Sequence, residues 1–315
     1  MEKLRIVFMG TPEFAVGILD TILKNNYEVV GVITAADKPA GRGQKLHYSA
    51  VKEYALTHNL RLLQPTNLKE ESFLAELQSL NANLQIVVAF RMLPEVVWKM
   101  PKLGTFNLHA SLLPNYRGAA PINWAIINGE TKTGVTTFFI DDKIDTGAML
   151  LRKETIISSD ENAGELHDRL MHIGSETVIE TLAMISEGNV ITTLQKDNDD
   201  IKTAYKLNRD NCKIDWNKSG NEIHNLIRGL SPYPAGWCLF KDKEEEWNVK
   251  LYEVIYNPEP HNFAIGAIIT TKKEIKIAVK DGFVNLLNLQ FPGKKRLQTH
   301  EFLNGMIFSE HAIAL

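Results

Sequence analysis

The sequence predicts an α/β fold with a doubly wound, mostly parallel, Rossmann-like sheet, followed by a small OB-like β-barrel domain. In the first half of the chain, short apolar runs alternate with segments of helical periodicity. This alternation is typical of parallel strands joined by crossover helices. A polar stretch follows near residue 190, and beyond it short strand-like segments recur at regular spacing, as in a small barrel.

The strands predicted in the first half are continuous apolar runs, which suit a sheet covered by helices on both faces. The predicted helices place apolar residues three and four positions apart. We expect strands at residues 4–9, 28–34, 84–89, 104–109 and 134–140, and helices at 13–23, 49–58, 70–80, 118–128 and 164–187. Since ligands of such sheets bind beyond the carboxyl ends of the strands, the site should lie just after Phe90, His109 and Ile140.

The second half begins with a polar segment and then changes character. We expect a linker at residues 189–205, between a domain at 1–188 and a second domain at 206–315. A short helix at 222–230 should precede strands at 236–240, 247–256, 266–271, 274–280 and 283–291. In the fourth of these strands, large apolar residues alternate with small or charged ones, which is typical of a strand with one buried face.

Composition narrows the class of protein. The 315 residues are 44% hydrophobic and 23% charged, which is ordinary for a globular protein. Cys212 and Cys238 form neither a disulfide framework nor a C-x-x-C metal spacing, so we expect no metal and a reducing, cytoplasmic location. The apolar run at residues 6–9 is too short for a signal peptide or a membrane span. We therefore expect no membrane segment, and a monomer.

Charge is distributed unevenly along the chain. The net charge is −3, with −4 over residues 1–190 and +3 over residues 201–315. The negative total argues against indiscriminate binding of nucleic acid, whereas the basic second half permits an RNA partner.

Asn107 and His109 are two positions apart in a predicted interior strand. Because successive side chains of a strand point to opposite faces, these two share one face. A buried amide or imidazole without a partner is costly, so the pair is expected to have a use. The alternative is a satisfied core histidine with an asparagine that caps the next turn, and the pair alone does not exclude it.

Two neighbouring segments favour a functional site. Residues 111–121 form a long loop after that strand, with two prolines and a glycine, and we expect it to expose Leu112 and Leu113 to a flat apolar ligand. Residues 141–147 follow another interior strand and would bring Asp145 to the same sheet edge as His109. The alternatives are a buried connecting loop and a turn aspartate that binds its own backbone.

Together, the segments GTFNLHASLLPNYRGAAPINWAIINGE and GVTTFFIDDKIDTG resemble the signature of the 10-formyltetrahydrofolate-dependent formyltransferases. The N-x-H pair, the SLLP loop and the D-x-G turn occur at the spacing of that family. The resemblance implies that Asn107, His109 and Asp145 are catalytic and that 10-formyltetrahydrofolate is the formyl donor. We assign folate contacts to Ser111, Leu112, Leu113, Pro114, Phe90, Met92 and Asp141.

The implied chemistry suits these residue types. An amine that attacks a formyl carbon builds negative charge on the formyl oxygen, which needs hydrogen-bond donors already in place. Asn107 can donate from its amide and His109 from an imidazole N–H, and a nearby carboxylate would favour the imidazolium. Asp145 can accept the proton of the amine through a water molecule. The sequence leaves open whether His109 is instead the direct base.

The outer segments MGTPEFAV, ADKPAGRGQKL and YKLNRDNCKIDWNKSGNEIHNLIRGLSPYPAGW resemble the branch of that family that formylates methionyl-initiator tRNA. The resemblance implies this RNA as the partner and a barrel-like second domain that helps to hold it. The loop at 37–45 predicts a cationic lid, and a basic run at 294–296 predicts phosphate contacts. For both, the alternative is a solvated surface. We assign tRNA contacts to Lys38, Arg42, Lys45, Lys294, Lys295 and Arg296, and expect residues 231–237 to be a packed linker.

Other enzymes remain as alternatives. A formyltetrahydrofolate hydrolase or a sugar-amine formyltransferase would share the catalytic segments. A nucleotide-binding oxidoreductase fits poorly because MGTPEFAV lacks the G-x-G-x-x-G pattern. A non-catalytic RNA-binding module conflicts with the acidic first domain and with the intact set of Asn107, His109 and Asp145.

Overall fold

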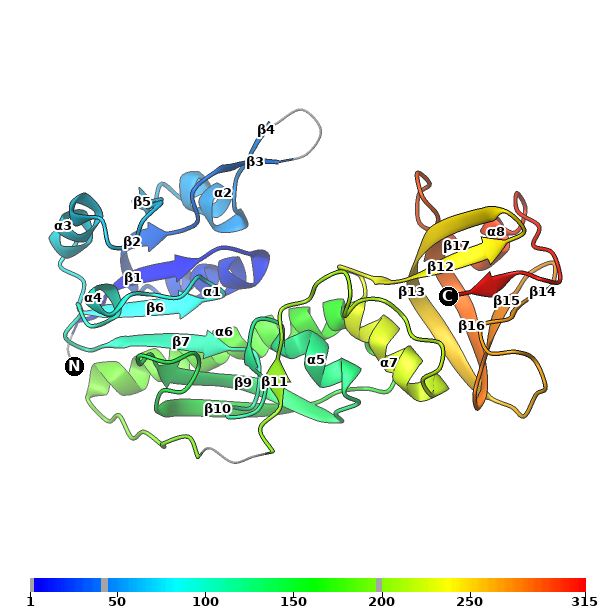
Figure 1. Cartoon of the computed structure of the whole chain (residues 1–315). Helices are drawn as coiled ribbons and strands as arrows, with labels where there is room; N and C mark the ends of the chain where they lie inside the picture. Colours follow the sequence, from blue (N-terminus) through cyan, green and yellow to red (C-terminus); the bar gives the residue numbers. More distant parts are fainter. Residues whose placement is uncertain (1–2, 41–44, 197–199) are drawn as a thin grey trace. The chain divides into compact units, whose positions relative to one another are not determined.

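The computed structural model describes residues 3–40, 45–196 and 200–315 (Figure 1). The chain forms two compact units. The first consists of Met1–Gly118, Gly134–Thr155 and His167–Thr203, and the second of Ala119–Thr133, Ile156–Leu166 and Ala204–Leu315. The first unit contains the α/β sheet and the second contains the barrel, as the fold class predicted from the sequence requires.

A seven-stranded sheet, in the order β10-β9-β7-β6-β1-β2-β5, organises the first unit. Strands β5, β2, β1, β6 and β7 run parallel to their neighbours, whereas β9 is antiparallel to β7. The strands are β1 (Arg5–Gly10), β2 (Glu28–Ile33), β5 (Leu62–Leu63), β6 (Leu84–Val88), β7 (Thr105–His109), β9 (Lys132–Phe139) and β10 (Met149–Ile156). The charged, alternating β10 was not among the predicted strands.

Helices accompany these strands where the apolar periodicity predicts them. In the first unit they are α1 (Glu13–Lys24), α2 (Ala50–Thr57), α3 (Glu71–Ser79) and most of α6 (Ala163–Glu187), with a further short α4 (Glu95–Trp98), whereas α5 (Pro121–Ile127) belongs to the second unit. On one side of the sheet, Val7 and Met9 of β1 share a core with Leu77 of α3 and Val97 of α4. No helix in the described part of the chain is long and apolar enough to cross a membrane.

The second unit contains a nearly closed antiparallel barrel in the strand order β14-β15-β16-β13-β12-β18. Its strands are β12 (Gly236–Asp242), β13 (Glu245–Pro258), β14 (Ile268–Thr270), β15 (Ile275–Val279), β16 (Gly282–Gln290) and β18 (Ile313–Ala314). A bridge between Ala267 and Ile313 joins the two ends of this order. The sequence predicted the first five strands but not β18, which is only two residues long.

The barrel core is apolar and includes residues of a helix that packs against it. Ile223 and Ile227 of α7 (Gly220–Leu230) lie in the same cluster as Phe240, Leu251 and other inward residues of the strands. Ser219 and Glu222 form a capping box that begins α7. The remaining short elements are β3 (Lys38–Ala40), β4 (Lys45–His47), β8 (Arg117–Gly118), β11 (Thr203–Ala204), β17 (Leu297–Gln298) and α8 (Thr299–Phe302).

Candidate active site

Strand β7 presents Asn107 and His109 on one face of the sheet. Between them, Leu108 points to the other face, where a Cβ atom on Gly174 of α6 would lie only 2.8 Å from its Cδ2. The alternation of a strand therefore directs Asn107 and His109 away from α6. Asn107 is half-buried, and its side chain makes no hydrogen bond within the described part of the chain, so its amide is available to a ligand.

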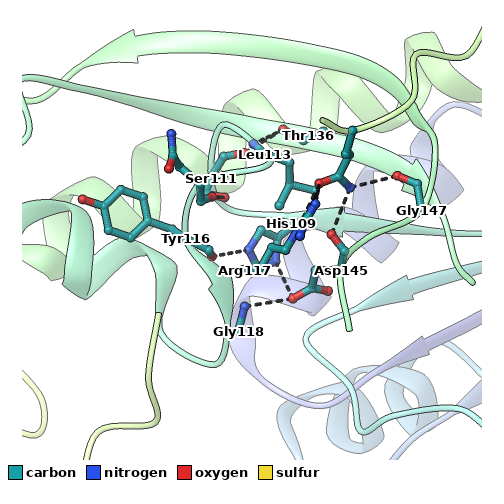
Figure 2. A network of polar contacts seen from close by, with 11 residues as sticks. His109, Ser111, Leu113, Tyr116, Arg117, Gly118, Thr136, Asp145 and Gly147 are labelled. Carbon is teal, nitrogen blue, oxygen red and sulfur yellow. Dashed lines mark hydrogen bonds and ion pairs between the residues drawn. The ribbon is translucent and has the colours of Figure 1, made fainter. Parts of the chain in front are cut away.

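His109 is buried, with 6% of its surface exposed, and its two ring nitrogens face different groups (Figure 2). Nε2 lies 2.8 Å from the carbonyl oxygen of Tyr116, and Nδ1 lies 3.8 Å from Oδ2 of Asp145. A carbonyl oxygen can only accept, so Nε2 carries a proton in this arrangement. The nitrogen that faces Asp145, and any bound substrate beside it, is therefore Nδ1.

In the described part of the chain, backbone groups rather than a lysine or arginine hold Asp145. Its Oδ2 accepts a hydrogen bond of 3.0 Å from the N–H of Gly118, and its own φ is +55° (Figure 2). Gln195 Nε2 donates to the carbonyl oxygens of Asp145 and Gly147, at 2.9 and 2.8 Å. These contacts fix the position of the carboxylate while leaving its second oxygen open to a proton donor.

The route by which Asp145 reaches His109 differs from the expectation. Because β9 is antiparallel to β7, Ile140 lies beside Thr105, with its N–H 2.8 Å from the Thr105 carbonyl. The carboxyl end of β9 is thus at the opposite edge of the sheet from that of β7. The prediction that the site directly follows Ile140 at a shared edge is wrong. Instead, the loop after β9 turns back and carries Asp145 to His109.

The loop after β7 is fastened to β9 through Thr136. Its hydroxyl donates to the carbonyl of Ser111 at 2.7 Å and accepts from the N–H of Leu113 at 3.2 Å. Ser111 and Leu113 are fully buried, and Leu112 and Pro114 are half-buried. The expectation that the loop exposes Leu113 is therefore wrong, because the hydrogen bond to Thr136 directs this segment toward the protein interior.

The other predicted folate residues have mixed environments. Phe90 is half-buried, whereas Met92 is 65% exposed. Asp141 accepts hydrogen bonds from the Thr146 hydroxyl and from the N–H of Lys143, at 2.7 and 3.1 Å. Asp141 therefore shapes the loop that carries Asp145.

The residues predicted to contact tRNA occur in two places. Arg42 lies outside the described residues, and Lys38 and Lys45 belong to the antiparallel pair β3–β4. Lys294, Lys295 and Arg296 are exposed between β16 and β17. The guanidinium carbon of Arg296 lies 4.4 Å from the ring centroid of Tyr252, and its Nε donates to Asn288 at 2.7 Å.

Four residues of this site were not found from the sequence. They are Tyr116, Gly118, Thr136 and Gln195. Tyr116 and Gly118 act through backbone groups, and Thr136 and Gln195 act through side-chain hydrogen bonds to the backbone of other segments. Nothing in these residue types indicates a functional role, apart from Gly118, which is the glycine of the predicted loop. Gln195 came from a segment that the sequence predicted to be a linker.

The segment at 231–237 is only partly the packed linker that the sequence predicted. Ser231 and Ala235 are buried, but Tyr233 is 83% exposed. The ring centroid of Trp237 lies 4.3 Å from the guanidinium carbon of Arg209 and 5.8 Å from Nζ of Lys213. Such contacts between a cation and an aromatic ring are common in folded proteins in general.

Comparison with known proteins identifies the class. The sequence model of the Formyl transferase family matches residues 4–182, and that of the Formyl transferase C-terminal domain matches residues 206–306. Both parts of the chain thus point to one class of enzyme, the formyl transferases, which agrees with a site built from an amide, an imidazole and a carboxylate.

Closer relatives narrow this class. The chain is 76% identical to the methionyl-tRNA formyltransferase of Flavobacterium johnsoniae, over 99% of both chains. It is 53% identical to the protein of that name from Bacteroides fragilis, over 98% of this chain and 97% of the other. The chain belongs to the methionyl-tRNA formyltransferase family.

Solved structures share the fold at lower sequence identity. A sugar 3N-formyl transferase, solved in the presence of dTDP and 5-N-formyl-THF, has a TM-score of 0.65 and 23% identity, over 94% of this chain and all of the other. An N-formyltransferase from Helicobacter canadensis, in complex with folinic acid and dTDP-3-aminofucose, has a TM-score of 0.63 and 22% identity, over 90% of this chain and 98% of the other.

Proposed function

We propose that this protein transfers the formyl group of 10-formyltetrahydrofolate to the α-amino group of methionyl-initiator tRNA. The observation that carries the proposal is the meeting of His109 and Asp145, 3.8 Å apart, on the face of β7 that also presents Asn107. The high identity to relatives named methionyl-tRNA formyltransferase supports the choice of amine.

In the proposed reaction the amine attacks the formyl carbon directly, without a covalent intermediate on the enzyme. Negative charge develops on the formyl oxygen, and the unpaired amide of Asn107 donates to it. His109, oriented by the Tyr116 carbonyl at 2.8 Å, supplies a second donor from Nδ1 when protonated. Asp145 accepts the proton of the attacking amine, directly or through a water molecule. The bond between the formyl carbon and N10 of the folate then breaks, a proton passes to N10, and tetrahydrofolate leaves.

Folate binding is proposed for the residues around this centre, namely Ser111, Leu112, Leu113, Pro114, Phe90, Met92 and Asp141. Ser111 and Leu113 have no exposed surface. We therefore propose that they contribute through their backbone groups, or by supporting the residues that contact the ligand. The proposed steps use no metal ion. Among the described residues, no group of three or more His, Cys, Asp or Glu side chains is arranged to hold one.

The tRNA is proposed to bind to Lys38, Arg42, Lys45, Lys294, Lys295 and Arg296. The exposed positions of the last three support this role, because phosphate contacts come from accessible cations. We also propose a catalytic domain at 1–188, a linker at 189–205 and a tRNA-binding domain at 206–315, which agrees with the family matches at 4–182 and 206–306. The cytoplasmic location and the monomeric state stay predictions.

Substrate assays test the proposal. The purified protein is given 10-formyltetrahydrofolate with charged initiator tRNA, with a dTDP-amino sugar, or with no amine. Formyl transfer to the methionyl group in the first reaction alone is the expected result. Transfer to the sugar would identify a sugar formyltransferase, and formate release without any amine would identify a hydrolase. Either result would contradict the proposed function.

A further inference from the structure

The hairpin of β3 and β4 leaves the first unit at the edge of the sheet where the candidate active site lies (Figure 1). It follows β2, and β2 runs in the same direction as β1, β6 and β7, so the carboxyl ends of these strands share one edge. The chain then enters α2, where the N–H of Val51 donates to the carbonyl of Thr11, just after β1, at 3.4 Å. The contacts at the base of the hairpin therefore set the direction in which it leaves this edge.

One lysine contacts the chain on both sides of the hairpin. Nζ of Lys52 in α2 lies 2.5 Å from Oδ2 of Asp37, which directly precedes β3. The same nitrogen lies 3.8 Å from the ring centroid of Tyr48, which directly follows β4. A carboxylate and the face of an aromatic ring both attract an ammonium group, so Lys52 joins the two ends of the hairpin to one point of α2.

Asp37 has a partner for each of its carboxylate oxygens. While Oδ2 accepts from Lys52, Oδ1 accepts from Nε2 of Gln64, just after β5, at 2.9 Å. The same Nε2 donates to the carbonyl of Ala35 at 2.8 Å. The hydrogen bond from Lys52, followed by the one from Gln64, keeps the pKa of Asp37 below its ordinary value. Asp37 is therefore held as a carboxylate in one orientation.

A second, neutral contact joins the same two segments of chain. Thr34 follows β2 and Ser49 precedes α2, and their hydroxyl oxygens lie 2.7 Å apart. Ser49 Oγ also accepts from the N–H of Lys52 at 3.0 Å and so caps α2. These contacts do not involve the Lys52 ammonium group. The helix and its attachment to the sheet should therefore persist when the ion pair is removed.

The burial of Lys52 indicates what the ion pair contributes. The residue is only 9% exposed, and removing an ammonium group from water is costly unless it is paired. A buried ion pair often adds no more stability than apolar side chains of similar volume would, whereas its geometry is far more specific. The pair with Asp37 therefore favours a role in fixing direction over a role in stability.

We propose that Lys52 and Asp37 are positioning residues for tRNA. They fix the direction of the hairpin that carries Lys38 and Lys45, and so raise the affinity for tRNA without taking part in the chemical step. The inference rests on the proposed function, which assigns tRNA contacts to both of these lysines. A hairpin already held in one direction loses less conformational freedom on binding. If loss of the pair leaves the competent direction populated about a tenth of the time, the apparent affinity falls about 10-fold.

Steady-state kinetics of Lys52→Met, Asp37→Asn and the double variant test the proposal. We expect the KM for charged tRNA to rise about 10-fold in each. The kcat at saturating tRNA and the KM of the formyl donor should stay within about twofold of the wild type. The double variant leaves no unpaired buried charge, so it should fold even if a single variant does not. Lys52→Arg, which keeps the charge, should retain most of the affinity.

Tyr54→Phe is the matched control. It removes a hydrogen bond of 2.9 Å between the same helix and Asp20 of α1, and it leaves the contacts of Lys52 in place. This variant should lower the melting temperature without changing the KM for tRNA. A rise in that KM as large as in the double variant would mean that any weakening of α2 impairs tRNA binding, and it would overturn the specific role of the ion pair.

Hydrogen exchange reports on the hairpin without an assay of activity. Peptides that cover β3 and β4 should exchange faster in the double variant than in the wild type, and at an unchanged rate in Tyr54→Phe. Unchanged exchange, an unchanged KM for tRNA, or a fall in kcat alone would each overturn the inference. If the wild type transfers no formyl group to tRNA, the proposed function fails, and with it the role in tRNA binding. The exchange rates still decide whether the ion pair holds the hairpin.

Discussion

The candidate active site in the first unit and the basic turn between β16 and β17 in the second unit are built from different kinds of contact. His109 is 6% exposed, and it and Asp145 are positioned by backbone groups at 2.8 and 3.0 Å. Lys294 and Lys295 are exposed on a turn. Chemistry at one carbonyl carbon requires fixed geometry, whereas attraction to a phosphate backbone tolerates moving charges. The effects of substitutions should therefore differ between the two regions. Those in the active site should be large and lower kcat, whereas those in the basic turn should be small and lower the affinity for tRNA.

The largest effect should follow from Asp145→Asn. Asparagine tolerates the φ of +55° and can still accept from the Gly118 N–H, so the loop should keep its shape. The proton acceptor is lost, and kcat should fall by about 10²–10⁴. Steady-state kinetics with charged tRNA measures this change, with Asp168→Asn on the exposed face of α6 as the control. Near-normal turnover would show that Asp145 is not the proton acceptor and that its contacts only stabilise the loop.

Asn107→Ala should have the next largest effect. The side-chain amide has no partner among residues 3–40, 45–196 and 200–315, so its removal should leave the melting temperature almost unchanged. Loss of one oxyanion donor should lower kcat by about 10²–10³. Measuring kcat and Tm on the same preparation separates the two properties. A large fall in Tm with unchanged kcat would make Asn107 structural and would remove one of the proposed donors.

Gly147→Ala tests the rigidity of the same loop. A Cβ at this position would lie 1.7 Å from the carbonyl oxygen of Phe139, so the loop must move. Such overpacking typically costs about 1–3 kcal/mol of unfolding free energy, and turnover should fall with the displaced Asp145. Gly305→Ala, where no atom lies within 4 Å of the added Cβ, is the control. Denaturant unfolding that gave equal stability for both variants would contradict the tight packing described here.

In the second unit, Lys294→Ala/Lys295→Ala should weaken tRNA binding only several-fold and leave kcat at saturating tRNA unchanged. Each lost phosphate contact should lower the slope of log affinity against log salt by about one, hence by about two for the pair. The charge-preserving Lys294→Arg/Lys295→Arg variant should keep the original slope. A full slope in the alanine variant would mean that these lysines are merely solvated.

The smallest effect should concern the reactivity of the two buried cysteines of the second unit, Cys212 and Cys238. Burial raises the pKa of the Cys238 thiol well above its ordinary value, and burial also raises the pKa of Cys212. A raised pKa lowers the thiolate fraction at every pH below it, so both thiols should resist alkylation at pH 8. Both should react once the protein is unfolded. Rapid alkylation of Cys238, the cysteine in the barrel core, in the folded protein at pH 8 would indicate that the barrel opens easily.

The sequence predicted the fold class and most of the helices and strands, because the spacing of apolar residues reflects which side chains are buried. It did not reveal the direction of β9. Residues 133–138 are buried, as in a central parallel strand, so the pattern is the same for either direction. It also missed β10, whose exposed charged residues alternate with partly buried ones, and β18, which is too short to show a period.

For the candidate site, sequence reasoning singled out three polar side chains, Asn107, His109 and Asp145, and the structure places the last two 3.8 Å apart. It missed the groups that hold them, because a backbone carbonyl of Tyr116 or an N–H of Gly118 exists at every such residue. It also misjudged Leu113, which the hydroxyl of Thr136 draws inward through a partner 23 positions away. Such long-range pairing leaves no local pattern.

Gln195 makes the polar stretch after α6 a part of the candidate active site. One amide joins that stretch to the carbonyls on either side of Thr146, while its oxygen accepts from Arg117 at 2.8 Å. We therefore expect a proteolytic cut between residues 188 and 194 to loosen the position of the Asp145 carboxylate while the sheet stays intact. Limited digestion that abolished turnover ahead of any loss of ellipticity would be the laboratory sign of this dependence.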